Sequence, residues 1–295
     1  MDGEGLDEVV LGLGTYPRSG GFVAVMRDHS GRYETLRWVR MPWSQYNAAN
    51  GAVFPACGDV DGDGRDEIVL GTGRYPGNGG MLAVLDDAAR NFALLGWIRA
   101  GNATYNASNG ETHPTCGDVD GDGFDEVVIG LSTTGGGVAV VHDDRARGWA
   151  TIGRLAWPNQ AYARAGGETW PACVDVDGNH KADIVLGPGT GGQGLLYLYA
   201  DRAGGFARTG ALGVPWGFYA AAVGAARPAG GNLDADGAVE VVVGLGTFPG
   251  ASGGFLYVFE DVSAGGSSRG RWIRYLNGAY NSVNGETWPS TGQIR

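Results

Sequence analysis

The feature that most constrains this chain is an internal repeat, because one acidic segment and the apolar run behind it occur five times. The copies start at Asp2, Asp61, Asp120, Asp177 and Asp234, so successive starts lie 59, 59, 57 and 57 residues apart. A fixed period of this size is typical of architectures in which each unit packs against its neighbours. Five units account for the whole length of 295 residues.

Each repeat divides into four short apolar runs that turn residues separate. In the second repeat the runs begin at Pro55, Glu67, Gly79 and Phe92. They are rich in Val, Ile, Leu and aromatic residues and are bounded by Gly, Asp, Asn or Pro, which is typical of β-strands. The chain also contains 56 Gly and 12 Pro, and no window keeps a helical period. We therefore predict an all-β fold, a five-bladed β-propeller of four-stranded antiparallel blades.

The two ends of the chain complement each other. Residues 285–295 match the first run of a repeat, and the rest of that repeat is the segment that begins at residue 1. We expect one domain over residues 1–295, with the ring closed by pairing of the N- and C-terminal segments in one shared blade. Such pairing leaves no open edge strand at either end.

Charge and apolar patterning exclude two classes of partner. The chain has 21 Lys and Arg against 32 Asp and Glu, a formal net charge of −11, which repels nucleic acids and acidic membrane surfaces. No apolar run approaches the roughly 18 residues of a membrane span, so no membrane insertion is expected. Cys57, Cys116 and Cys173 stand at one repeated position, and we expect them to be reduced and unpaired.

The acidic turns are suited to a metal ion. In the turn from Asp59 to Glu67, carboxylates stand at positions 1, 3, 5 and 9, with Gly for a tight bend and a backbone carbonyl at position 7. These groups can surround one hard cation with oxygen, and a flexible all-oxygen loop favours calcium over magnesium. Without a cation the carboxylates would repel one another. The alternative is a set of Asp- and Asn-rich tight turns that hold no metal.

The repeated acidic turns resemble the FG-GAP or VCBS repeat family, which includes the propeller of integrin α subunits, propeller lectins and some polysaccharide lyases. The resemblance covers all five repeats. It implies a propeller fold with calcium ions in the turns, bound by side chains at positions 1, 3, 5 and 9 and by the carbonyl at position 7. These positions are occupied by Asp59, Asp61, Asp63, Arg65 and Glu67 in the second repeat and by Asp118, Asp120, Asp122, Phe124 and Glu126 in the third.

The other three turns carry less complete sets by the same resemblance. The fourth has His180 at the bend in place of Gly, and the first would have to borrow a residue from the far end of the chain. Their expected ligands are Asp175, Asp177, Asn179, Lys181 and Asp183 in the fourth turn, Asn232, Asp234, Asp236, Ala238 and Glu240 in the fifth, and Asp2, Glu4 and Glu8 in the first.

The crossovers between repeats are expected on the face opposite the calcium turns. One Tyr is aligned in all five, and Trp, Asn and Glu recur around it. Aromatic rings beside amide and carboxylate groups suit sugar recognition. The alternative is that these residues wedge neighbouring blades together. The candidate ligand-binding residues are Trp43, Tyr46, Tyr105, Asn106, Glu111, Tyr162, Glu168, Trp216, Tyr219, Tyr280, Asn281 and Glu286.

No pattern of catalytic residues emerges, because the four histidines occupy unrelated repeat positions. We therefore expect a calcium-binding recognition or adhesion module that is not an enzyme. Its ligand would be a glycan, as in a multivalent lectin-like domain, or a protein, as in the docking or assembly domain of a larger extracellular protein. A lyase-like enzyme is a third alternative. Calcium loops of this kind suit the millimolar calcium found outside cells, so an extracellular or cell-surface location is expected.

Overall fold

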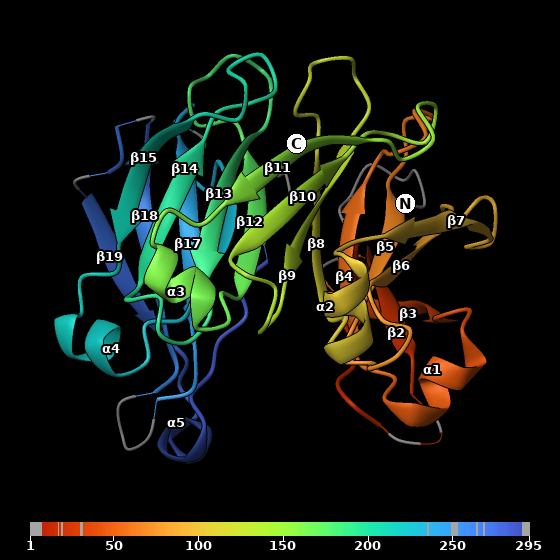
Figure 1. Ribbon diagram of the computed structural model, residues 1–295, viewed down its shortest axis with the longest axis horizontal. Coiled ribbons are helices and arrows are strands. Elements are labelled where there is room, and N and C mark those ends of the chain that lie inside the picture. Colours follow the sequence, from red (N-terminus) through yellow and green to blue (C-terminus); the bar gives the residue numbers. More distant parts are fainter. Residues whose placement is uncertain are drawn as a thin grey trace.

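The computed structural model describes residues 8–290, except 17, 19, 30, 31, 235, 249–252, 264 and 268. Five separate antiparallel sheets follow one another along the chain and stand as the blades of a β-propeller (Figure 1). Blades 2 to 5 have four strands each, and blade 1 has three within the described residues. The predicted five-bladed, all-β fold is confirmed.

The strands follow the order expected from the repeats. Blade 1 contains β1 (Val9–Gly12), β2 (Phe22–His29) and β3 (Arg32–Arg40), and blade 2 contains β4 (Val53–Gly58), β5 (Glu67–Thr72), β6 (Met81–Leu85) and β7 (Leu94–Arg99). Blade 3 contains β8 (Thr112–Gly117), β9 (Glu126–Leu131), β10 (Val138–His142) and β11 (Thr151–Ala156). Blade 4 contains β12 (Thr169–Val174), β13 (Asp183–Pro188), β14 (Leu195–Tyr199) and β15 (Arg208–Gly213), and blade 5 contains β16 (Ala226–Gly231), β17 (Val239–Leu245), β18 (Phe255–Val262) and β19 (Arg269–Arg274).

Five short helices form the crossovers, which the sequence had not indicated. They have only five or six residues each, too few for a helical period to show in the sequence. Among the described residues, no helix is long and apolar enough to cross a membrane. The helices are α1 (Ser44–Ala49), α2 (Ala103–Ser108), α3 (Gln160–Arg164), α4 (Gly217–Ala222) and α5 (Gly278–Val283).

The two ends of each blade carry different structures. The helices lie at the lower end in Figure 1, whereas the loops that join β8 to β9 and β12 to β13 lie at the upper end. In blade 2 the ladder between β4 and β5 places Gly58 opposite Glu67, so the acidic turn begins directly after the first strand and ends on the first residue of the second. The last carboxylate of the turn is therefore anchored in a core strand.

The core lies in the seams between blades. In β5, Ile68 and Leu70 pack in the cluster shared with blade 1, whereas Val69 packs in the cluster shared with blade 3. Both faces of the strand are buried, which explains why the runs are continuously apolar rather than alternating. Cys57, Cys116 and Cys173 are free thiols on the first strands, as expected.

A glycine near the end of each second strand allows the next blade to approach. A Cβ atom at Gly71 would overlap the Thr112 carbonyl oxygen and the Pro114 ring of blade 3. A Cβ atom would overlap the equivalent carbonyl and proline of the following repeat at Gly12, Gly130, Gly187 and Gly244. The contacted atoms are backbone or ring atoms, which cannot rotate away.

Gly71→Ala should therefore destabilise the protein by about 1–3 kcal/mol, as overpacking of a tight core does. Gly213→Ala in β15 is the matched control, because the nearest atom to its added Cβ would be Leu195 Cδ2 at 3.7 Å. Chemical denaturation of both variants would measure the difference. Equal stability of the two would contradict the close approach of the blades.

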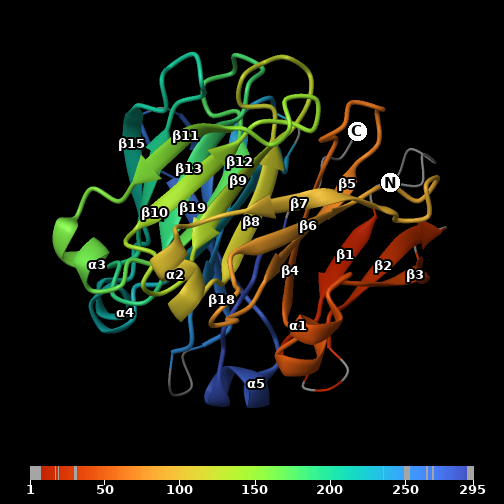
Figure 2. The ribbon, with the colours of Figure 1, turned by 45° about the vertical axis from the view of Figure 1, so that its right-hand side comes forward.

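The seam between blade 5 and blade 1 differs from the other four. Ile273 is 47% exposed, whereas its equivalent in blade 2, Ile98, is 2% exposed. On the opposite side, Leu11 and Leu13 of blade 1 are also more than a third exposed. Figure 2 brings β1, β2 and β3 to the right-hand edge, beside β4.

The C-terminal segment nevertheless follows the path of a first strand. Thr287 and Pro289 lie against Gly244 as Thr112 and Pro114 lie against Gly71. Residues 285–290 form no strand, and residues 1–7 and 291–295 are outside the described part of the chain. Closure of the ring by the two chain ends stays a prediction.

Candidate functional site

The acidic turn of blade 2 is folded around its first carboxylate. Asp59 accepts hydrogen bonds from the backbone N–H groups of Gly62 at 2.7 Å and Gly64 at 2.9 Å. Both glycines have a positive φ, of 78° and 86°, so the bend requires residues that adopt the left-handed region easily. The turn thus holds the Asp59 carboxylate on the inside of a tight loop.

The last carboxylate of this turn is buried and half satisfied. Glu67 is fully buried, and its Oε2 accepts hydrogen bonds from the N–H groups of Val60 at 3.0 Å and Asp61 at 3.2 Å. Glu67 Oε1 and Asp61 Oδ1 are buried without a hydrogen-bond partner among the described residues. Ligand oxygens of Asp59, Asp61 and Glu67 lie within 4.8 Å of one another. Unpartnered buried anionic oxygens are costly, and a bound cation would satisfy them.

This crowding changes the acidity of the turn. Burial, together with the charges of Asp61 and Asp59, raises the pKa of Glu67 to about 8. Burial also raises the pKa of Asp59, with smaller contributions from Asp63 and Asp61. Without a cation, the turn therefore favours protonated carboxyl groups.

The turn of blade 3 repeats this geometry. Asp118 accepts from Gly121 N at 2.6 Å and Gly123 N at 3.0 Å. Glu126 is also fully buried, with Oε2 accepting from Val119 N at 2.8 Å and Oε1 unpartnered. Burial and the three neighbouring Asp charges raise the pKa of Glu126 to about 8. Oxygens of Asp118, Asp120 and Asp122 lie within 4.8 Å of one another.

The fourth turn tolerates a residue other than glycine at its bend. His180 adopts φ = 65°, and its N–H donates to Asp175 at 2.8 Å as Gly64 N does to Asp59. Asp183 accepts from Val176 N at 2.9 Å, and burial raises its pKa to about 6. Asn179 uses its amide to donate to Asp201. The loop keeps its shape although its ligand set is less acidic.

The two remaining turns are described only in part. In the fifth, Glu240 is buried, Oε2 accepts from Leu233 N at 2.6 Å, and Oε1 has no partner among the described residues. In the first, Asp2 and Glu4 lie outside the described residues, and Glu8 is the first residue within them. The residues expected to offer a backbone carbonyl to the metal share one local feature. The N–H of each donates to the side chain at position 5 of its turn, and these residues are Arg65, Phe124, Lys181 and Ala238.

A second group of acids, which the sequence analysis did not assign, approaches these turns. Asp143 and Asp144 follow the third strand of blade 3, and their carboxylates come within 4.8 Å of Glu126 together with Asp120 or Asp122. Both are nearly fully buried. The Asp that recurs near the end of each third strand, as in Asp86-Asp87, was the available signal.

Arginines of the following blade partly neutralise the turns. Arg145 of blade 3 donates to Asp61 of blade 2 at 2.7 Å, and Arg202 of blade 4 donates to Asp120 of blade 3 at 2.5 Å. Both arginines are at least 40% exposed, so these pairs contribute little energy. The buried oxygens at position 9 remain without a positive partner.

The helices α1 to α5 lie on one face of the propeller (Figure 1), called here the helical face. On this face, four of the five crossover tyrosines are buried. The Tyr105 hydroxyl donates to the carbonyl of Glu111 in its own crossover and accepts from Ser132 N, at the end of β9, at 2.9 Å. The same pair of bonds occurs at Tyr46, Tyr162 and Tyr219. These four rings join successive blades, as the packing alternative required, and do not present a surface to a ligand.

The neighbouring candidates pack in the same way. Asn106 and Asn281 are buried against Gly80 and Gly254, where an added Cβ atom would overlap their side-chain oxygens. Trp216 stacks on Tyr219 with ring centroids 5.5 Å apart. Trp43 lies against Tyr46 at the same separation.

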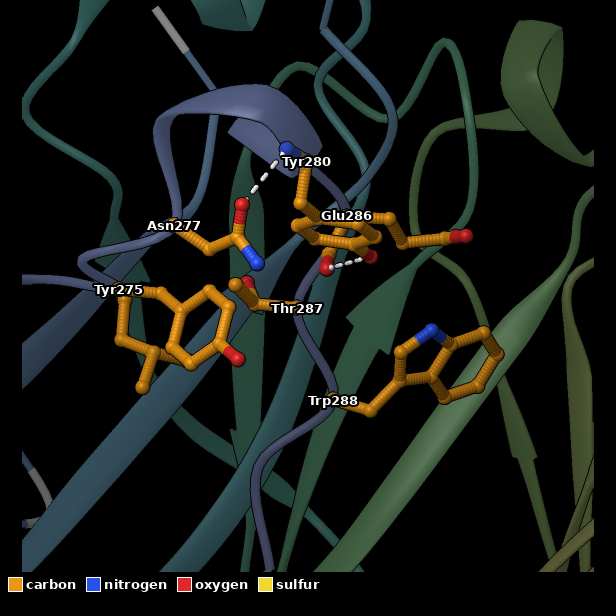
Figure 3. Close-up of a pocket in the computed structure, with 7 residues that line it drawn as sticks. Tyr275, Asn277, Tyr280, Glu286, Thr287 and Trp288 are labelled. Atoms are coloured by element: carbon orange, nitrogen blue, oxygen red, sulfur yellow. Dashed lines mark hydrogen bonds between the residues drawn. The ribbon is translucent and has the colours of Figure 1, made fainter. Parts of the chain in front are cut away.

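Tyr280 is the exception, because it lies at the exposed seam of blade 5. Its ring is 37% exposed, whereas Tyr105 is 3% exposed. It lines a pocket of about 420 Å³, where Glu286 and Trp288 extend from the segment after α5 (Figure 3). The pocket is lined by Leu256, Tyr275, Asn277, Tyr280, Glu286, Thr287 and Trp288.

The two other candidate glutamates lie near the propeller axis. Glu111 contacts His113 Nε2 at 3.0 Å, and atoms of Glu111, His113 and Glu168 lie within 4.8 Å of one another. Burial alone would raise the pKa of Glu111, but the hydrogen bond and the charge of His113 hold this pKa below its usual value. Glu286 instead pairs with Arg227 at 2.5 Å.

Comparison with known proteins gives distant relatives of one kind. No family model matches the chain. Integrin alpha-PS2 of Drosophila melanogaster is 27% identical over 68% of this chain, and integrin alpha pat-2 of Caenorhabditis briggsae is 27% identical over 67%. Integrin alpha-4 of Xenopus laevis is 26% identical over 44%. The chain spans less than a fifth of the length of these relatives, 15%, 18% and 13% respectively.

Among solved structures, similarity is limited. A rhamnogalacturonan lyase of Bacillus licheniformis aligns with a TM-score of 0.46 at 13% identity, over 85% of this chain and 59% of the lyase. The Dos1 propeller aligns with a TM-score of 0.47 at 10% identity, over 87% of this chain and 56% of that one.

Proposed function

We propose that this chain is a calcium-binding propeller that serves recognition or adhesion and is not an enzyme. The observation that carries this proposal is the set of buried, unpartnered carboxylate oxygens on Glu67, Glu126 and Glu240, each at the end of an acidic turn. The similarity to integrin α chains supports the same class of function. Calcium loops of this type fill at millimolar concentrations, so we propose an extracellular or cell-surface setting.

Metal content tests the first part of this proposal. Native mass spectrometry of protein dialysed against calcium should show at least one bound ion for each of the turns of blades 2 and 3. Glu67→Gln and Glu126→Gln should each lose one ion, because each removes one charged ligand. A folded parent protein with no bound calcium would refute the proposal.

The partner is proposed to be a protein, in line with the integrin relatives, and a glycan is the second candidate. The pocket of blade 5 favours the glycan, because the exposed ring of Trp288 stands beside the carboxylate of Glu286 (Figure 3). Such a pair can bind the apolar face of a sugar and one of its hydroxyl groups.

A glycan array, read with calcium present, separates the two candidates. If a glycan binds in this pocket, Trp288→Ala should reduce binding at least tenfold, whereas Trp38→Ala, an exposed tryptophan on β3, should not. Absence of any glycan signal would remove the lectin candidate and leave the protein partner.

A further inference from the structure

Five side chains that occupy one repeat position meet at the propeller axis. Each precedes the proline of a first strand, and their rings or guanidinium lie within about 6 Å of a neighbour. The residue at this position varies widely between repeats, and it is Phe54, His113, Trp170, Arg227 and Trp288 in turn. A position that only maintained the repeat would not need four such different side chains.

His113 is held in one orientation by the backbone. It is 2% exposed, and its Nδ1 lies 2.9 Å from the Thr169 carbonyl oxygen. A carbonyl only accepts, so Nδ1 carries the proton and donates. Nε2 is thus the nitrogen left to face the carboxylates, and it lies 3.0 Å from Glu111 Oε1. Metal-binding histidines are oriented in this way, by donating their other N–H to a carbonyl or carboxylate.

Two carboxylates from different blades lie close to this ring. Glu111 precedes β8 of blade 3 and Glu168 precedes β12 of blade 4, and one ligand atom each of Glu111, His113 and Glu168 lie within 4.8 Å of one another. Glu111 Oε1 is 3.0 Å from His113 Nε2. The crossover tyrosines fix both backbones, because Tyr105 donates to the Glu111 carbonyl and Tyr162 donates to the Glu168 carbonyl.

Buried donors beside this group lack acceptors. Trp170 stacks on His113 with ring centroids 3.4 Å apart and is 9% exposed, yet its Nε1–H has no partner among the described residues. Arg227, 5.2 Å from the Trp170 ring, has two unpartnered nitrogens, Nε and Nη1. Buried N–H groups without acceptors indicate that an oxygen-bearing ligand, such as a water or an anion, belongs at this place.

We propose that Glu111, His113 and Glu168 form an axial site for a first-row divalent cation such as Zn²⁺, distinct from the calcium turns. One imidazole nitrogen and two carboxylate oxygens suit Zn²⁺, whereas the acidic turns offer oxygen alone and suit calcium. Three protein ligands leave a fourth position for a water or an anion, which would accept from Trp170. The ion would also join blades 3 and 4 at the axis.

Zinc binding by the full chain tests this site. The protein is stripped with a chelator and saturated with calcium, and Zn²⁺ is titrated by calorimetry. We expect one zinc ion per chain that calcium does not displace, and a higher melting temperature when it binds. His113→Gln and Glu168→Gln should each weaken binding at least tenfold. Glu286→Gln is the matched control, because Glu286 has the same repeat position but pairs with Arg227.

A Co²⁺ titration adds a readout that folding alone would not change. Cobalt in the parent protein should give a visible absorption band that Glu168→Gln loses and Glu286→Gln keeps. Two results would overturn the proposal. One is that the calcium-saturated parent protein binds no zinc, and the other is that the parent protein and folded Glu168→Gln bind zinc equally. Either would leave His113 as the charged partner of Glu111 in an ion pair.

Discussion

Excess chelator is expected to lower the melting temperature of this protein by about 10 °C or more, and calcium should restore it. A ligand that binds only the folded state at 100 times its dissociation constant contributes about 2.7 kcal/mol per site. Two filled turns would thus contribute about 5 kcal/mol, and 1 kcal/mol shifts the melting of a domain this large by roughly 2–4 °C. Differential scanning calorimetry with calcium or with chelator measures the shift.

The same sites make a prediction about pH. In the metal-free protein, Glu67 and Glu126 have folded pKa values of about 8, above their ordinary value of 4.5. The folded state therefore binds more protons than the unfolded state between these values, so stability should fall as pH rises from about 5 to 8. Calcium holds both carboxylates ionised and should abolish this loss, since metal binding releases protons.

Glu67→Gln is the control for this pH dependence. The amide cannot titrate, so the metal-free variant should lose less stability across the same range than the parent protein. Melting measured at several pH values with chelator would show it. If the metal-free parent gains stability toward pH 8, the buried acidic turns are not organised as described.

Tyr105→Ala is expected to destabilise the protein by about 3–5 kcal/mol, as truncation of a buried aromatic side chain does. The change also leaves the Ser132 N–H at the end of β9 without its acceptor. Tyr280→Ala removes the equivalent ring at the exposed seam, where it is 37% exposed, and should cost about 1 kcal/mol or less. Urea denaturation of the two variants compares one repeat position in two environments.

Tyr105→Phe separates the ring from its hydroxyl. The phenyl ring keeps the packing, but the Ser132 N–H loses its acceptor, which costs about 1–3 kcal/mol for a buried donor. An equal loss in Tyr105→Ala and Tyr280→Ala would argue against the inter-blade role of the crossover tyrosines. It would also indicate that blades 5 and 1 meet as closely as the other pairs do.

The repeat was sufficient to predict the fold class and the local shape of the acidic turns. Asp59 to Glu67 form a local loop, and the spacing of carboxylates and glycines along nine residues determines which side chains face inward. The number of repeats likewise predicted the number of blades. These features depend on neighbours in the sequence, so a single sequence was enough to find them.

The roles of the crossover residues on the helical face could not be predicted from the repeat in this way. Tyr105 and Tyr280 have similar local sequences, but one is buried because blade 3 packs over it and the other is exposed because no described blade does so. Asp143 approaches Glu126 because two turns of one blade share a face. In each case the environment is supplied by a segment far along the chain.

The sequence by itself thus determined the repeat, the blade, the acidic turns and the absence of a charge pattern for nucleic acids. Only the tertiary structure decided which tyrosines are buried, which acids gather beside the turns, and which side chains converge on the axis. Glu111 and Glu168 stand 57 residues apart, yet each directly precedes the first strand of its blade, and residues of these two strands, His113 and Trp170, stack on each other. Ring geometry brings equivalent positions of successive repeats together, although they are far apart along the chain.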